Sequence, residues 1–372
     1  MARYLNLDDV HSFGMRCDKH APDLFEEDEV DGLQVCRITR ENRASGESVL
    51  VSIENETVFS PSQLKRLRQY SQDAFQLFFV RQVRSWTTLK ISRHLFQDLI
   101  DFCGAFWCFW DCAFTFGRKE EENNMEFPSY RARQIKLGSE TEFESAYVLR
   151  RVELHGRECS EDEEPWSIRQ TAVHHKSHSL DQSIPTFIVI NPSTSAERML
   201  LSSMSLALED LRAVAPFNVH RILIADSLKN WRNYMGSLEE RLREQSDQVI
   251  MTKVGEEKED LSHLGDRNIN FADRQKLKRL EDSIAELQVI LNSLLNAVWG
   301  VRTQCEQYCK NLCLRKGLEC DCQIMLGEFD SHIGELNVYI KRSTILHEQA
   351  NGVAQLVCIV LRVKVKILIS NS

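Results

Sequence analysis

The residues of this sequence best suited to chemistry are cysteines near its C-terminal end. Five thiols lie within 18 residues, at Cys305, Cys309, Cys313, Cys320 and Cys322. Zinc and iron–sulfur clusters need thiolates that converge on one point. The first three thiols recur at four-residue steps, so on a helix they share a face and lie too far apart for one tetrahedral ion. The last three could converge where that helix breaks. Buried thiols, thiol-bound metal and redox chemistry all stay open for this cluster.

Three histidines, His174, His175 and His178, form a second candidate metal-binding group. They fall at the end of a predicted strand, where neighbouring side chains point to opposite faces of a sheet. His174 and His175 therefore cannot easily share one ion, and core or surface histidines explain them as well. The acidic run at 158–164 could attract divalent cations weakly, but a solvated loop is the favoured interpretation. The sequence names no metal ligand and requires no cofactor.

Enzyme signatures are missing from the sequence. It has no Walker A loop, no Gly-x-Gly-x-x-Gly, no Gly-x-Ser-x-Gly and no His-Glu-x-x-His. These patterns place phosphates, dinucleotides, a nucleophile or zinc. We therefore expect no enzymatic activity and assign no catalytic residue.

Composition limits the partners and the compartment. The 372 residues include 46 Lys and Arg against 55 Asp and Glu, for a net charge of −9. Such a surface repels phosphate backbones, so nucleic acid is not an expected partner. Twelve cysteines without an apolar N-terminal leader are typical of reduced thiols in the cytoplasm. The apolar run Phe102–Phe116 is too short for a bilayer, and charges interrupt Val353–Ile369. We expect a cytoplasmic chain, at most peripheral to a membrane.

The elements that position these residues begin with an N-terminal α+β region. Ser60 and Ser92 are good helix N-caps. The aromatic run Phe102–Phe116 predicts a core segment, with a ligand- or lipid-facing surface as the alternative. Short apolar or alternating segments predict the strands of a mixed or antiparallel sheet. These segments are Val49–Ile53, Gln76–Val83, Ser145–Val152, Trp166–His175, Thr186–Ile190 and, as a last strand, Arg221–Ala225.

The strongest periodic signal follows an acidic linker at 251–271. Apolar side chains alternate at steps of three and four over five heptads, which predicts a coiled-coil-like helix about 54 Å long. They are Leu277, Leu280, Ile284, Leu287, Leu291, Leu294, Val298, Val301, Cys305, Tyr308 and Leu312. The pattern resumes in a second helix from Leu326 to Ile340. We predict that this interaction stripe packs against the second helix or another subunit.

Four parts of the chain follow from these patterns. Residues 1–250 form the α+β domain and residues 251–271 the linker. Residues 272–350 form a long helical stalk or hairpin, and residues 351–372 an atypical tail. The fold class is therefore α+β, with a sheet and helices first and long C-terminal helices after it.

Several sequence blocks resemble a group of filamentous-fungal proteins, the CorA-like magnesium transporter-domain proteins. The most specific block is Pro165-Trp166-Ser167-Ile168-Arg169-Gln170-Thr171-Ala172-Val173, and others begin at Leu89, Phe114, Ser129, Tyr147, Asn230 and Leu277. The likeness extends from about residue 50 to residue 340. It implies a cytosolic α/β domain, a stalk helix and two membrane helices. It also implies five subunits around one pore, with a Gly-Met-Asn entrance for hydrated Mg²⁺.

The sequence departs from that family pattern at the pore. It contains no Gly-Met-Asn, because its one Gly-Met pair, Gly14-Met15, precedes Arg16. No membrane helix is recognised, so as written the chain is not expected to transport, unless its C-terminal end is a truncated gene reading. No pore residue is carried over.

Three functions therefore stay open. The first is the cytosolic regulatory part of a CorA-like Mg²⁺ transporter, which would associate with itself or with a membrane-embedded relative. The second is a soluble helical interaction or scaffold protein. The third is a thiol-metal protein that uses Cys305–Cys322.

Overall fold

The computed structural model of the chain contains two units. The described residues are 7–26, 32–42, 49–67, 73–82, 84–119, 126–137, 140–157, 165–178, 185–206, 215–250, 270–316 and 322–370. The first unit comprises Met1–Arg151, Ser167–Leu228 and Asn296–Ile333. The second comprises Val152–Trp166, Lys229–Leu295 and Gly334–Ser372. The acidic linker predicted at 251–271 lies almost wholly outside the described residues.

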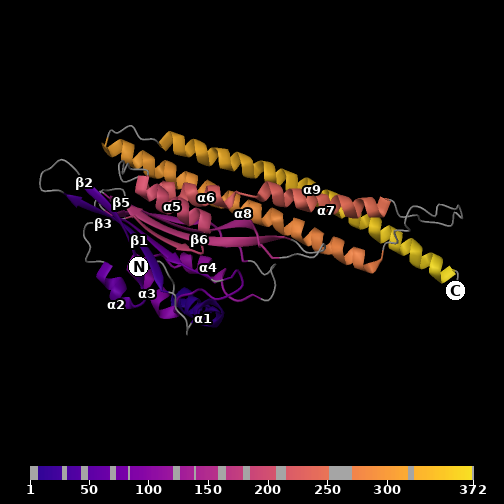
Figure 1. The fold of residues 1–372 in the computed structure, drawn as a ribbon, viewed down its shortest axis with the longest axis horizontal. Coiled ribbons are helices and arrows are strands. Elements are labelled where there is room, and N and C mark those ends of the chain that lie inside the picture. The colour runs from indigo at the N-terminus through magenta and orange to yellow at the C-terminus, as the bar shows by residue number, and fades with distance from the viewer. Residues whose placement is uncertain are drawn as a thin grey trace. The chain divides into compact units, whose positions relative to one another are not determined.

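A seven-stranded mixed sheet is the centre of the first unit (Figure 1). Its strand order is β2-β1-β3-β7-β6-β5-β4. The strands are β1 (Leu33–Asn42), β2 (Val49–Val58), β3 (Asp73–Val80), β4 (Arg131–Leu137), β5 (Glu140–Leu154), β6 (Trp166–His178) and β7 (Thr186–Ile190). Strands β3 and β7 pair in parallel, while β1·β2, β1·β3, β4·β5 and β6·β7 pair antiparallel. The predicted α+β class with a mixed sheet is confirmed.

Helices from the N-terminal half cover one face of the sheet. They are α1 (Leu7–Leu24), α2 (Pro61–Arg66), α3 (Arg93–Cys103) and α4 (Cys108–Phe114). The side chains of Ser60 and Ser92 cap α2 and α3, as predicted. The aromatic run Phe102–Phe116 contributes side chains to the hydrophobic core. Trp110 is buried, and its ring lies edge-on to Phe96 with centroids 5.0 Å apart. This apolar packing holds α3 and α4 on the sheet.

Helices α5 (Thr194–Leu206) and α6 (Ala215–Ser227) follow the last strand. The predicted strand Arg221–Ala225 is wrong, because these residues form the middle of α6. Ile222, Leu223 and Ile224 are all buried. A helix enclosed on several sides shows the same short apolar run as a buried strand, so periodicity cannot separate the two.

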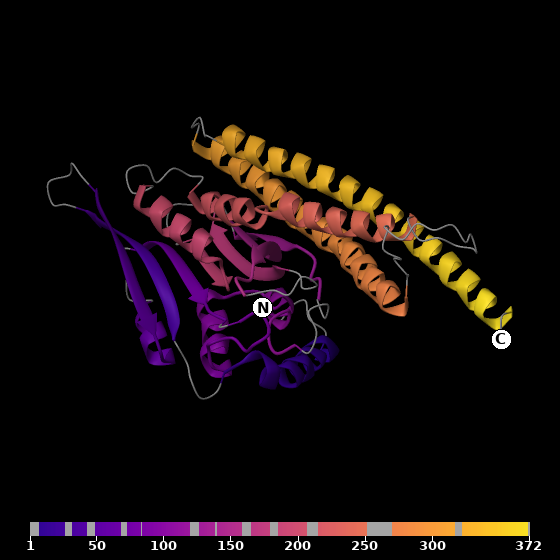
Figure 2. The same ribbon diagram turned by 45° about the vertical axis from the view of Figure 1, so that its right-hand side comes forward.

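Three helices make up most of the second unit: α7 (Trp231–Ile250), the first part of α8 (Phe271–Lys316) and the later part of α9 (Cys322–Ser370) (Figure 2). The guanidinium of Arg342 on α9 pairs with both carboxylate oxygens of Glu239 on α7, each at 2.5 Å. The amide of Gln288 on α8 donates to the carbonyl of Ser343 on α9 at 3.3 Å. These bonds fix how α9 is rotated against α7 and α8. The segment interpreted as a separate tail is helical to Ser370.

One helical stretch of the described chain, Phe271–Asn311, is long and apolar enough to cross a membrane by length and composition. In its most apolar 18-residue window, 44% is buried within the chain. The core helix of a soluble protein passes the same test, so this is a weak indication. The expectation that no segment spans a membrane stays a prediction.

Burial along α8 predicts unequal effects of two neighbouring substitutions. Leu287 is fully buried, whereas Val289 is 49% exposed on the same helix. Leu287→Asp places a carboxylate in the helix core, so we expect it to lower the free energy of unfolding by at least about 3 kcal/mol. Val289→Asp should change it by less than about 0.5 kcal/mol. Urea unfolding followed by circular dichroism measures both, and equal losses would contradict this packing.

Candidate functional site

The predicted interaction stripe lies inside the chain. From Leu277 to Leu294 its members belong to the second unit, and from Val298 to Tyr308 to the first. All of them except Leu312, whose side chain is not described, are buried. In the first unit the ring of Tyr308 packs against Phe143 and Phe217, with centroids 5.4 Å and 5.3 Å away. The stripe therefore packs against the chain's own helices and strands, and a role in binding another chain stays a prediction.

His174 and His175 point to opposite faces of the sheet, as their positions on one strand predict. His174 lies on the α4 side, with its ring 5.3 Å from that of Phe109. His175 lies on the α6 side and stacks on Phe187, with centroids 4.2 Å apart. The two side chains do not share a site. The side chain of His178 is outside the described set.

A buried carboxylate joins His174 to two other segments. Oε1 of Glu144 lies 2.7 Å from Nε2 of His174 and accepts the backbone N–H of Phe106 at 2.6 Å. Oε2 of Glu144 pairs with the Arg133 guanidinium. Burial raises the pKa of Glu144, but the bonds to His174, Arg133 and the Phe106 amide outweigh it and leave the pKa lowered. This carboxylate is saturated by protein donors, so it is not available as a metal ligand.

A second polar chain lies on the other face, between Tyr147, His220 and His175. The Tyr147 hydroxyl is 2.5 Å from Nδ1 of His220, whose Nε2 is 2.9 Å from Nδ1 of His175. Burial lowers the pKa of His220 to about 3, and burial with the neighbouring His220 and His174 lowers that of His175 well below its usual value. Both rings are therefore neutral at physiological pH and connect β5 and β6 with α6.

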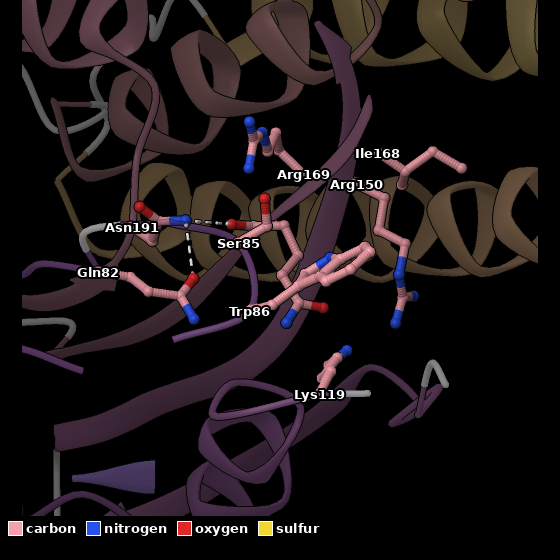
Figure 3. Close-up of a pocket in the computed structure, with 9 residues that line it drawn as sticks. Gln82, Ser85, Trp86, Lys119, Arg150, Ile168, Arg169 and Asn191 are labelled. Atoms are coloured by element: carbon pink, nitrogen blue, oxygen red, sulfur yellow. Dashed lines mark hydrogen bonds between the residues drawn. The ribbon is translucent and has the colours of Figure 1, made fainter. Parts of the chain in front are cut away.

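A small basic hollow opens at the carboxyl ends of the parallel pair β3 and β7 (Figure 3). Its lining residues are Gln82, Ser85, Trp86, Lys119, Arg150, Ile168, Arg169, Gln170 and Asn191. Only about 20 Å³ of it admits the centre of a water molecule, which is room for a water or a small ion. The carboxyl ends of parallel strands are a recurrent place for ligands. Among the described residues, three cationic side chains and no carboxylate line this hollow, so these residues disfavour a divalent cation.

Asn191 fixes one wall of the hollow. Its φ is 54°, a left-handed conformation that asparagine tolerates better than most residues. Its side-chain N–H group donates to the side-chain oxygen of Gln82 and to the backbone carbonyl of Gln170, both at 3.4 Å. The backbone carbonyl of Asn191 accepts from the hydroxyl of Thr171 at 3.0 Å. Arg150, across the hollow, donates to the carbonyl of Glu126. The sequence analysis predicted no site at these residues. The Asn191-Pro192 dipeptide, which is typical of turns, could have predicted the turn after β7.

A larger groove of about 410 Å³ lies between the edge strand β4 and helix α8. The backbone N–H of Tyr130 donates to Asn296, and the Tyr130 hydroxyl donates to Gln304, both at 3.1 Å. The Tyr130 ring lies directly against Gly300, where a Cβ atom would overlap it. Gly300 is thus required for the close approach of this segment to the helix.

Two cysteines of the cluster are bonded to each other. Cys309 and Cys322 form a disulfide with Cα atoms 6.3 Å apart, so the expectation that every cysteine is reduced is wrong for them. Cys305 is buried one turn before Cys309. The side chain of Cys313, and all of Cys320, lie outside the described residues. Within the described part of the chain, no three His, Cys, Asp or Glu side chains gather to hold a metal ion.

Comparison with known proteins gives the class. The family of CorA-like transporters matches residues 7–250. The chain belongs to this family of CorA-like transporters. Among curated proteins none matches the chain.

Several solved structures are similar to this chain. The soluble domain of CorA from Methanocaldococcus jannaschii is 10% identical with a TM-score of 0.39, over 88% of this chain and 97% of that one. The ZntB cytoplasmic domain from Vibrio parahaemolyticus is 9% identical with a TM-score of 0.38, over 86% and 98%. Full-length CmaX is 12% identical with a TM-score of 0.44, over 92% and 82%.

Because Tyr130 packs against Gly300 of α8, replacing this glycine and replacing Gly327 of α9 should change the stability of the chain in opposite directions. No atom of the described residues lies within 4 Å of the position that a Cβ atom would take at Gly327, so Gly327→Ala should stabilise α9 by about 0.5–1 kcal/mol through helix propensity. Gly300→Ala should instead destabilise the chain by about 1–3 kcal/mol, because the added methyl group overlaps the Tyr130 ring. Thermal unfolding compares the two variants, and stabilisation by both would show that Tyr130 does not pack there.

The buried His220 predicts an acid-sensitive fold. Its pKa is about 3 in the folded chain and about 6.5 when unfolded, so the unfolded state binds the extra proton between these values. Stability should therefore fall as pH drops below about 6.5, by about 2 kcal/mol at pH 5 for this group alone. His220→Gln should flatten the pH profile of the melting temperature, whereas His94→Gln, on the exposed side of α3, should not. Identical profiles for wild type and His220→Gln would refute the assignment.

Proposed function

We propose that this chain is the cytosolic, regulatory part of a CorA-like divalent-cation transporter, with Mg²⁺ as the cation. The observation that carries the proposal is the family match over residues 7–250, which covers the sheet, its covering helices and α7. Two helices of 46 and 49 residues follow. At a rise of about 1.5 Å per residue each extends about 70 Å, far more than the sheet needs to be covered.

Mg²⁺ binding in this proposal depends on oxygen ligands and retained water. Mg²⁺ prefers carboxylates in octahedral geometry, and the chain has 55 Asp and Glu. No set of three ligating side chains gathers among the described residues. We propose that cation binding uses carboxylates from more than one copy of the chain. The basic hollow and the saturated Glu144 are not candidates.

Mg²⁺ stabilisation tests this proposal on the full chain. If Mg²⁺ binds the folded state, millimolar MgCl₂ should raise the melting temperature by several degrees over NaCl of equal ionic strength. The matched salt removes simple screening of the acidic surface. A melting temperature that is the same in both salts would contradict cation regulation and favour the soluble scaffold function.

Self-association is the second part of the proposal, and the outer face of α9 is its surface. Val338, Ile345, Leu356 and Ile359 are 47–61% exposed there. With Gly352 they recur at steps of seven, four and three, the spacing that pairs helices side by side. We call these five residues the outer α9 stripe. The ion pair of Arg342 with Glu239 fixes the rotation of α9 in its unit.

The partner at the outer α9 stripe is a second copy of the chain, or a membrane-embedded relative with the same helix. Heptad-spaced apolar residues gain stability by excluding water between two helices. An exposed stripe on one long helix meets its own equivalent in a symmetric pair. Its polar neighbours on α9, such as Thr344, would then lie at the rim of the contact.

Charge substitutions on α9 test this contact. Ile345→Asp should weaken self-association at least about tenfold, because a carboxylate would be buried between copies. Thr344→Asp, exposed beside the stripe, is the matched control and should change the association constant less than about twofold. Sedimentation equilibrium gives both constants. A wild-type chain that stays monomeric at micromolar concentration, or two variants with equal loss, would refute this surface.

A further inference from the structure

The end of the α8–α9 hairpin carries the disulfide of Cys309 and Cys322. Cys309 lies about two turns before the last residue of α8, and Cys322 is the first residue of α9. Their side chains are 5% and 3% exposed. The bond therefore ties the start of one helix to the end of the other, across 13 residues of sequence.

Other cysteines of the chain are typical of a reducing environment. Cys17, Cys108, Cys112 and Cys358 are not disulfide-bonded, and Cys108 and Cys358 are partly accessible. A chain kept in an oxidising compartment normally pairs such thiols. Disulfides in reducing compartments are usually transient, and they act in catalysis or redox sensing. A reversible bond between Cys309 and Cys322 fits this pattern.

The position of Cys322 gives this pair a chemical asymmetry. The first residue of a helix lies beside N–H groups that have no partner within the helix, at the positive end of the helix dipole. A helix N-terminus stabilises a thiolate relative to the same side chain in the middle of a helix. In thiol–disulfide exchange a stabilised thiolate is a good leaving group. Cys309, within α8, lacks that environment.

We infer that Cys309 and Cys322 form a reversible redox switch that responds to low-molecular-weight disulfides and thiols. On oxidation, the Cys322 thiolate attacks the small disulfide, forms a mixed disulfide and releases one small thiolate. Cys309 then gives its proton to solvent and attacks the Cys322 sulfur, and the second small thiolate leaves. One small disulfide is reduced to two small thiols as the protein dithiol becomes a disulfide. Reduction follows the reverse steps.

The switch acts locally, because other contacts of the first unit hold the hairpin without it. Arg302 on α8 pairs with Asp330 on α9 at 2.8 Å. Phe329 is fully buried, and Tyr308 packs against Phe143 at a centroid distance of 5.4 Å. Reduction should therefore free the first turns of α9 up to this packed region and leave the sheet intact. The redox state of the switch would therefore control whether the first turns of α9 are ordered.

Peptide mapping of the full chain tests the switch. The protein is equilibrated with different ratios of oxidised to reduced glutathione, alkylated and digested with trypsin. Cleavage after Arg302, Lys310 and Lys316 separates Cys313 from both partners. We expect peptide 303–310 linked to peptide 317–341, fragmenting at Cys309 and Cys322, with a reversible two-electron transition. Cys305→Ala, the matched control one turn away, should keep the link, and Cys309→Ala should lose it.

Hydrogen exchange reads the output of the switch. Amides at 323–328 should exchange at least about tenfold faster in the reduced chain, and the Cys309→Ala/Cys322→Ala variant should match the reduced rate at every glutathione ratio. Three results would overturn the inference. They are no linked peptide at any ratio, a link that persists until circular dichroism shows global unfolding, and one zinc ion bound per reduced chain. The last would assign the cluster to metal binding.

Discussion

A sheet covered on both faces leaves its central strands no side that meets water. The polar residues of β5 and β6 must therefore find partners inside the protein, because an unpaired buried polar group is costly. Glu144 is satisfied by His174, Arg133 and the Phe106 amide on one face. Tyr147, His220 and His175 are hydrogen-bonded in a chain on the other face, and Nε2 of His175 is left without a partner among the described residues. These two networks tie α4 and α6 to the same pair of strands.

The need to pair buried polar groups inside the protein also limits which side chains can bind ligands or partners. Side chains committed to these networks, and the buried stripe of α8, are not available to ligands or partners. The accessible features lie at the margins: the basic hollow at the ends of β3 and β7, the groove beside β4 and the outer face of α9. In the proposed function the sheet serves as a scaffold, and regulation would fall to the long helices and to contacts between copies.

Local patterns predicted much of this fold, because they act over a few residues. Ser60 and Ser92 cap helices as expected, and Thr186–Ile190 is a strand with the predicted bounds. The alternation of side chains along a strand correctly predicted that His174 and His175 lie on opposite faces of the sheet. Long-range features could not be predicted in this way. The hollow depends on the parallel pairing of β3 and β7, whose residues are over a hundred positions apart. The disulfide depends on how α8 and α9 align, and no spacing rule for cysteines encodes that alignment.

In the proposed function this chain is a cation-regulated, self-associating cytosolic part of a CorA-like transporter. Its most direct test is the molar mass of the full chain by sedimentation velocity, over a series of Mg²⁺ concentrations at constant ionic strength. We predict a change between two defined oligomeric states as Mg²⁺ is added, reversed by chelation. One unchanging mass across the series, whether monomer or oligomer, would contradict it.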